Sequence, residues 1–479
     1  MGYNPSVNIT VNEALSLSPG ESVTTIMIVG TAQWGPIDSV QSFTNFSNVL
    51  NTFGEDRNDN TSITKMADIV YSNGAQSVKV LRIADSGKIK ATLDLAGDSA
   101  GTADVMTFNA KYYGAYGNNF YVDIDEQGTG RIATITNGDY KEVFDNNGDA
   151  NGYASNALLA AAINDSVSGS ALIDAVSNSV DVIDATASLT QLTTGDDGAN
   201  GLSASDYTTA FDSYLSTEDW DILVIGDTDN TNLESGDAFQ SSITTKVDSR
   251  ASTNKKYSMY FSGVTQNEII GTIQARTASG SRLVLAAPGI EVDSRVESTT
   301  AQLDGTYLAG ALAGMVAAND IEIALTRKVV GVNDFIINTS TDVNYYNLTE
   351  VESLLGSGVC VSSKLGGALK VARGVTRISD KTSVYYEINI RRIVDDIRTK
   401  IQNLLDGFLG DPSVERNRKM IASECDGVLN SAVAAEELVA YQTTQVTEAS
   451  SPDTINVALT IQPTFAINFI NVVISVSKV

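Results

Sequence analysis

The chain has 479 residues, of which 42% are hydrophobic and 19% are charged, a balance typical of folded globular protein. At about 150 residues per domain, this length predicts about three domains. The formal net charge is −27, which argues against wrapping nucleic acid or docking on anionic lipid, because both need an excess of Lys and Arg. We therefore expect neither direct nucleic-acid binding nor stable membrane insertion.

The sequence contains no histidine, which excludes the commonest hydrolase and metalloenzyme designs. Without imidazole there is no Ser-His-Asp triad, no Cys-His pair and no His-ligated metal. The two cysteines, Cys360 and Cys425, fit neither a disulfide framework nor a zinc motif, and no GxxxxGK[ST] phosphate loop occurs. We expect no catalytic residue, no metal and no cofactor.

A strongly acidic segment follows the first part of the chain. Residues 91–219 hold 20 acidic against 3 basic side chains, and residues 142–245 contain no Lys or Arg. Apolar and polar residues alternate along Phe120–Ile124 as in a strand, and residues 157–164 predict a short helix. Because turn-rich sequence flanks this segment, we predict an inserted β-rich domain over residues 93–200.

Apolar runs then alternate with helix-length segments. Ile222–Ile225, Tyr257–Phe261 and Leu283–Ala286 are typical of strands buried on both faces of a parallel or mixed sheet. Residues 303–317 predict a helix whose Gly and Ala residues allow close packing, and its apolar run is far shorter than the ~20 residues of a membrane span. A middle α/β domain is predicted over residues 201–345.

The C-terminal part begins with two predicted helices. An apolar residue recurs every three or four positions over Ile393–Phe408, which predicts a long helix that stops at Gly410. Asp411 is then predicted to cap a second helix, with Pro412 in its first turn. Cys425 stands at helical spacing from apolar neighbours, so we expect a buried thiol. Strand character follows after Ser450.

Both ends of the chain alternate between β-branched and polar or small residues without any charge. Such a strand needs a partner for its backbone groups, and it either closes its own sheet or adds to the sheet edge of a neighbouring molecule. No basic and apolar leader opens the sequence, so we expect no secretory signal. The candidate strand-arm residues are Val7, Ile9, Val11, Ile470, Val472, Ile474 and Val476.

Basic residues concentrate near the C-terminal end, where residues 370–420 hold 11 of the 31 Lys and Arg. On a strongly acidic chain, this face is a candidate contact for an acidic partner, although it also fits the solvated side of an amphipathic helix. The candidate residues are Arg391, Arg392, Arg398 and Lys400.

The predicted fold class is therefore multidomain α/β and α+β, with mixed sheets flanked by helices, a β-rich insertion and extended terminal strands. The predicted segments are an N-terminal arm (1–22), a first core part (23–92), the insertion (93–200), the middle domain (201–345), a C-terminal domain (346–462) and a C-terminal strand arm (463–479).

Several motifs follow one another in a distinctive order. They are IMIVGTAQWGP at Ile26–Pro36, VKVLRI at Val78–Ile83, AKYYGAYGNN at Ala110–Asn119, AAPG at Ala286–Gly289, and the helix INIRRIVDDIRTKIQNLLDGFLGDP at Ile388–Pro412. In order and spacing they resemble the tail sheath proteins of contractile phage tails and related injection systems. Each motif alone is a glycine turn or an amphipathic helix.

The resemblance implies a virion component, the tail sheath, assembled in the host cytoplasm. It implies stacked hexameric rings of this chain around a tail tube protein, with baseplate and tail-terminator proteins at the ends and with terminal arms that add strands to neighbours. It also implies a subtilisin-like middle domain without protease chemistry. Contraction would drive the tube through a target envelope without any nucleotide or cofactor.

The strongest alternative is an extracellular surface-layer or filament-forming protein, which shares the acidity, the low cysteine content and the terminal strands. Such a protein normally carries a secretion signal. A carboxylate-dependent hydrolase ranks third. Electron microscopy separates the first two, because a sheath forms hollow striated tubes and a surface layer forms flat sheets.

Overall fold

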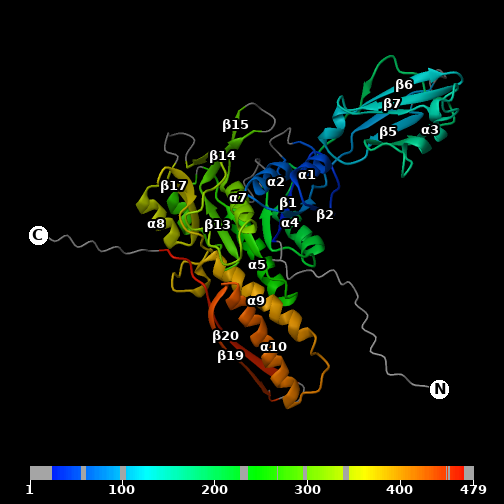
Figure 1. Ribbon diagram of the computed structural model, residues 1–479. Coiled ribbons are helices and arrows are strands. Elements are labelled where there is room, and N and C mark those ends of the chain that lie inside the picture. Colours follow the sequence, from blue (N-terminus) through cyan, green and yellow to red (C-terminus); the bar gives the residue numbers. More distant parts are fainter. Residues whose placement is uncertain are drawn as a thin grey trace, which may run out of the picture.

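The computed structural model describes residues 24–55, 61–97, 104–226, 236–266, 268–294, 299–337, 345–448, 450 and 454–468. Figure 1 shows a central α/β body from which a β-rich domain projects on one side and a module of helices and strands on another. This arrangement confirms the predicted multidomain α/β and α+β class.

The central body is built on an eight-stranded sheet in the order β18-β17-β13-β12-β11-β1-β3-β2. Neighbouring strands from β17 to β3 are parallel, and β18 and β2 pair antiparallel at the edges. The apolar runs predicted as buried strands form β11, β12 and β13. The strands are β1 (Thr25–Gly30), β2 (Val40–Phe43), β3 (Ser77–Arg82), β11 (Ile222–Ile225), β12 (Met259–Gly263), β13 (Leu283–Ala287), β17 (Val359–Leu365) and β18 (Ala368–Val371).

Helices cover both faces of this sheet, and a small sheet extends one side of it. Ile26 and Ile28 of β1 face the core formed with α1, α2 and α7, whereas Met27 and Val29 face the core formed with α4 and α5. The helices are α1 (Phe46–Phe53), α2 (Ile63–Ser72), α4 (Ala204–Ala210), α5 (Asp237–Thr253), α6 (Ile270–Ala275), α7 (Gly305–Ala317) and α8 (Leu348–Gly356), and the small sheet contains β14 (Gly289–Asp293), β15 (Thr300–Leu303) and β16 (Asp334–Ile336).

Helix α7 confirms the close packing expected from its small residues. A Cβ atom on Gly310 would lie 2.3 Å from Sδ of Met66, and one on Gly314 would lie 2.4 Å from the carbonyl oxygen of Val70. Both neighbours belong to α2, so the two helices approach as closely as glycine allows. In the part of the chain that the structure describes, no helix combines the length and the apolar character needed to cross a bilayer.

The projecting domain is the acidic insertion. An antiparallel bridge between Ile89 and Asp196 marks its base, a few residues from the predicted limits. Trp34 of the central body is buried in its core, with ring centroids 5.0 Å from Tyr112 and 5.1 Å from Phe120, so the insertion shares a core residue with the central body. Its elements are β4 (Thr92–Leu95), β5 (Met106–Ala110), β6 (Tyr121–Gln127), β7 (Gly130–Thr136), β8 (Lys141–Phe144), α3 (Asn156–Ile163), β9 (Ile173–Ser177) and β10 (Thr190–Gln191).

The C-terminal module has its own hydrophobic cluster. It contains α9 (Ile388–Asp406), α10 (Glu415–Ala434) and a hairpin of β19 (Leu438–Glu448) and β20 (Ile455–Pro463). The predicted apolar stripe forms the buried face of α9. The hairpin and the two helices enclose this cluster together, because an isolated two-stranded hairpin is marginally stable and needs a helix layer to pack against.

Three features of this part differ from the sequence expectations. Helix α9 ends at Asp406, before the predicted stop at Gly410. Helix α10 begins at Glu415 with Val414 as its N-cap, because hydrogen-bonded turns occupy the chain around Asp411. The central sheet also crosses the boundary predicted at residue 346, since β17 and β18 complete its edge.

Both cysteines are buried free thiols, as predicted for Cys425. Burial raises the pKa of Cys360 to about 12 and also raises the pKa of Cys425. Because the thiolate is the reactive form, we expect neither thiol of the folded protein to react with an aromatic disulfide reagent at mildly alkaline pH. Absorbance should report two thiols per chain only after guanidinium unfolding, and a fast-reacting thiol in the folded protein would contradict this burial.

Candidate assembly surfaces

The sequence-predicted contact residues fall into two groups. The terminal strands at residues 7–11 and 470–476 lie outside the described residues. The four basic candidates all lie on α9, but on different sides of it: Arg391 is 4% exposed, Arg392 is half-buried, and Arg398 and Lys400 are exposed. The structure therefore does not gather the four cations into one surface.

A buried charge cluster joins α9 to the central sheet. The carboxylate of Asp395 accepts hydrogen bonds from Nη1 and Nη2 of Arg282, at 2.6 and 2.8 Å, and from Nε of Arg391 at 3.0 Å. Arg282 precedes β13 and also donates to the carbonyl oxygen of Ser258. Bidentate Arg–carboxylate pairs have strict geometry, so this cluster fixes where α9 sits on the sheet.

Lys400 is held by carboxylates of its own chain. Its Nζ atom lies 2.5 Å from Asp396 and 3.3 Å from Glu437. Burial disfavours the charged form of Lys400, but the hydrogen bond to Asp396 and the nearby negative charges outweigh burial and raise its pKa. Burial raises the pKa of Glu437. An external acidic partner would compete with these two carboxylates.

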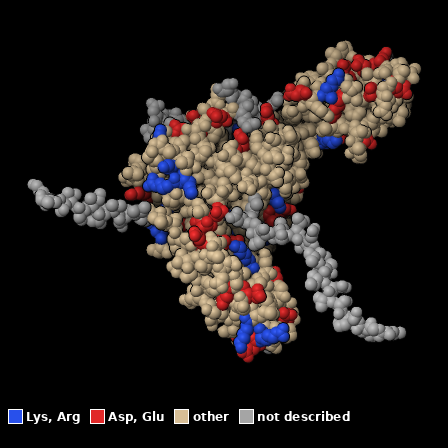
Figure 2. Space-filling view, in the orientation of Figure 1, with Lys and Arg blue, Asp and Glu red and all other residues tan. Residues whose placement is uncertain are grey.

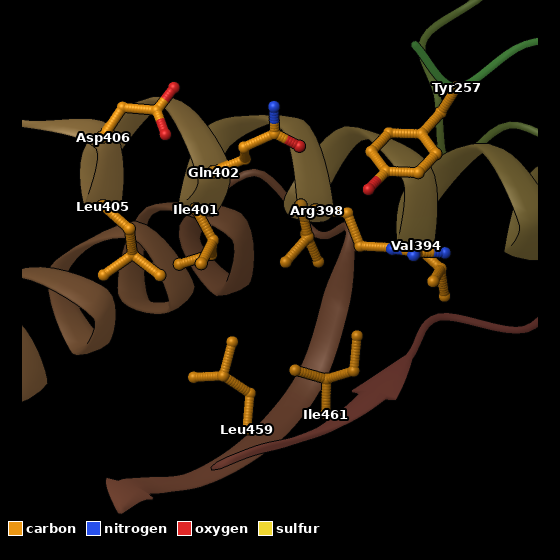
Figure 3. Close-up of a pocket in the computed structure, with 10 residues that line it drawn as sticks. Tyr257, Val394, Arg398, Ile401, Gln402, Leu405, Asp406, Leu459 and Ile461 are labelled. Atoms are coloured by element: carbon orange, nitrogen blue, oxygen red, sulfur yellow. The ribbon is translucent and has the colours of Figure 1, made fainter. Parts of the chain in front are cut away.

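An apolar groove of about 400 Å³ runs between α9 and β20 (Figure 3). Its rim carries Arg398, whose guanidinium lies 4.3 Å from the ring centroid of Tyr257. The apolar lining residues are Val394, Ile397, Ile401, Leu405, Leu459 and Ile461. Because both walls of the groove are apolar, water is a poor occupant.

The hairpin beside this groove is an isolated two-stranded sheet. Among the described residues, β19 and β20 pair only with each other, so each strand keeps one edge without a β partner. Along β20, the inward-facing side chains are only half-buried and the residues between them are exposed; the half-buried residues include Val457, Leu459 and Ile461. A further strand on the β20 edge would cover the apolar groove.

The connection between α9 and α10 forms an exposed tip. Leu409 and Val414 are 81% and 48% exposed, and Arg416 and Lys419 are exposed beside them. Figure 2 shows basic side chains gathered at this end of the C-terminal module. Sequence reasoning missed this surface, although the cations of residues 416–419 stand beside the apolar Val414 in the printed sequence.

The sheet crevice where doubly wound folds bind ligands is occupied by protein here. The strand order reverses beside β1, at the carboxyl ends of β1 and β11. There the N–H of Thr31 donates to Oγ of Ser62 at 3.1 Å, and Cβ atoms added to Gly30 or Gly226 would collide with Ser62. Within the described ranges no group of three or more Cys, Asp or Glu side chains is arranged to hold a metal ion.

Comparisons with known proteins identify the fold. No family model matches the sequence, and no curated protein matches it. A sheath tail protein from Listeria innocua shares 18% identity with a TM-score of 0.66, and the match covers 92% of each chain. A sheath tail protein from Desulfitobacterium hafniense shares 14% identity at a TM-score of 0.66, covering 96% of this chain and 100% of the other.

Assembled particles contain the same fold. The helical sheath of the anti-feeding prophage in its contracted state matches 99% of this chain and 99% of its own, with 11% identity and a TM-score of 0.56. The sheath complex of an extracellular contractile injection system, also contracted, matches 99% of this chain with a TM-score of 0.54. The chain thus has the fold of tail sheath proteins over essentially its whole length.

Replacing Asp395 tests the buried charge cluster. We expect Asp395→Ala to lower the free energy of unfolding by about 3–5 kcal/mol, because buried Arg391 loses its carboxylate partner and buried Arg282 keeps only the longer ion pair with Asp248, at 3.7 Å. Urea unfolding followed by circular dichroism measures this loss. Asp406→Ala is the matched control on an exposed position of the same helix and should change stability by less than about 0.5 kcal/mol. Equal effects of the two changes would show that the cluster does not hold α9 in place.

Proposed function

We propose that this protein is the structural subunit of a contractile tail sheath. In this proposal it polymerises as stacked hexameric rings around a tail tube, with baseplate and tail-terminator proteins as end partners, and contracts to drive the tube through a target cell envelope. The observation that carries the proposal is the fold match to sheath proteins over 92% or more of the chain. The subunit would need no catalytic residue and no cofactor, and its middle domain would have a subtilisin-like arrangement.

The hairpin supplies a physical reason for polymerisation. Among the described residues its two outer edges, one on β19 and one on β20, have no strand partner, and the sequence supplies two uncharged strand patterns, at residues 7–11 and 470–476. We propose that these arms add to the hairpin edges of neighbouring subunits. Backbone hydrogen bonds would give affinity, and apolar side chains of the added strand would fill the groove beside β20.

The exposed tip is the better candidate for a tube contact. Arg391 pairs with Asp395 in the buried interior, whereas Arg416 and Lys419 are exposed beside apolar side chains, and the ion pair of Lys419 with Glu415 is itself exposed to solvent. We propose that the tip meets an acidic surface of the tube, and that Arg398 and Lys400 are separate secondary contacts, with Lys400 exchanging its own carboxylates for those of the partner. Exposed cations and apolar groups together suit an interface that forms and then slides.

Removing residues 470–479 tests the arm. Full-length protein should form hollow striated tubes in electron microscopy, and the truncated protein should remain a folded monomer in sedimentation and circular dichroism. The reason is that the β20 edge would lose its added strand. The control replaces the same residues with a Gly/Ser segment of equal length, which restores chain length but no strand pattern, and it should behave like the truncation.

Other outcomes of this experiment distinguish the proposed strand exchange from its alternatives. Tubes from truncated protein would rule out strand exchange at this end. An unfolded truncated protein would place these residues in the core of their own chain. Flat sheets from the full-length protein would favour the surface-layer alternative.

Charge reversal tests the tip. We expect Arg416→Glu with Lys419→Glu to weaken co-sedimentation of sheath with tail tubes by about tenfold at low salt. The difference from wild type should shrink as salt rises, because exposed charges are screened over ~10 Å at 0.1 M ionic strength. Lys255→Glu with Lys381→Glu is the matched control, since both lysines are exposed elsewhere on the central body. Equal losses in the two variants would contradict a specific contact at the tip, because binding to the tube would then depend only on the net charge of the protein.

A further inference from the structure

The described chain begins against α9. Nη2 of Arg392 donates to Oγ1 of Thr24 at 3.1 Å, and the backbone N–H of Thr25 donates to Asp221 at 2.7 Å. Arg392 in turn faces the carboxylates of Asp221 and Asp396. The N-terminal arm therefore joins the body at a hydrogen-bonded position on the fifth residue of α9.

The described chain also ends against α9. Nδ2 of Asn468 donates to Oε1 of Glu387 at 2.6 Å, and Glu387 is the N-cap residue of α9. Glu387 is 3% exposed and forms an ion pair with Arg373 at 2.5 Å. Oδ1 of Asn468 accepts a hydrogen bond from Thr326 at 3.3 Å. The C-terminal arm is thus tied to a buried and charged anchor.

The two attachment points are close together on one helix. Glu387 and Arg392 are five residues apart, about 8 Å along the helix axis. Between them, Asn389 is 2% exposed, and its Nδ2 donates to the carbonyl oxygen of Glu322 at 3.3 Å. The first turns of α9, which are mostly buried, therefore contact both the first and the last described residues of the chain.

We propose that the first turns of α9 are a common root that sets the direction of both arms, with Arg392 positioning Thr24 and Glu387 positioning Asn468. This inference rests on the proposed sheath function and adds positioning residues to it. A segment held in its binding direction loses less conformational freedom when it adds to a neighbour, and its effective concentration at the acceptor rises.

The test removes the side-chain contacts of both roots and leaves the arms intact. Thr24→Ala with Asn468→Ala should leave the melting temperature of the monomer unchanged and raise the critical concentration for tube formation by about tenfold. In the monomer, hydrogen exchange should rise at residues 24–25 and 464–468. Thr24→Ser with wild-type Asn468 keeps the hydroxyl acceptor and should assemble like the wild type.

The matched control removes the same two kinds of side chain elsewhere. Thr107→Ala with Asn178→Ala breaks hydrogen bonds of 2.5 and 2.8 Å within the inserted domain and should not change assembly. Unchanged exchange at the two roots, or a wild-type critical concentration despite raised exchange, would overturn the common root. A lowered melting temperature of the root variant would also overturn it, because the contacts would then serve the fold. The exchange readout uses monomer, so unchanged exchange overturns the common root even where the full-length protein forms no tubes, whereas a failure of the full-length protein to form tubes would instead contradict the proposed sheath function.

Discussion

The ion pairs of Asp395 tie α9, the helix beside which the candidate assembly surfaces lie, to the central body. This carboxylate holds Arg282 of the central body and Arg391 of α9 in one buried cluster, and α9 borders the groove and the tip and contacts the first and last described residues, Thr24 and Asn468. A buried charge cluster is weak as a source of stability, but it specifies one geometry, because each charge is tolerated only with its partner in place. The buried charges therefore set the orientation of the C-terminal module, and apolar side chains fill its core.

The charge distribution separates two kinds of surface. The acidic insertion and the C-terminal module project from different sides of the central body (Figure 1). Residues 93–200 hold 16 acidic against 3 basic side chains, about half of the net negative charge, and this share lies away from the hairpin and the tip. Like charges near the hairpin edges would oppose the approach of another acidic copy. Trp34 of the central body is buried in the core of the insertion and so joins the two parts.

The elements that could be predicted best from the sequence are those in which the pattern of apolar side chains directly indicates which residues are buried. Ile222–Ile225 is a strand over the predicted residues, and the stripe on α9 faces its core, because continuous runs and helical spacing are local signals. Strand β19 has no such signal, since most of its side chains are polar or exposed and only pairing with β20 makes it a strand. Asp411 and Pro412 form a strong local start signal that the turn after α9 overrides.

The placement of single cations could not be predicted from local pattern. Arg391, Arg392 and Arg398 look alike along the helix, yet one is buried by Asp395, one faces Thr24 and one covers Tyr257. The contacts of Arg392 and Arg398 are with residues more than 100 positions away, and the pair of Arg391 with Asp395 is buried because Arg282, also distant in sequence, packs against it. The exposed tip could not be predicted from the sequence, because the exposure of a side chain depends on which surfaces the folded chain leaves uncovered.

The low identity to the solved sheath proteins is compatible with a shared fold for a physical reason. Parallel strands such as β11 and β13 require apolar residues of suitable volume, and many sequences satisfy that requirement. Strand addition at a hairpin edge uses backbone groups, so it constrains alternation and the absence of charge more than identity. The groove beside β20 likewise needs only apolar walls. Specific side chains are needed where geometry depends on charge, as at Asp395, and where helices approach through glycine, as at Gly310.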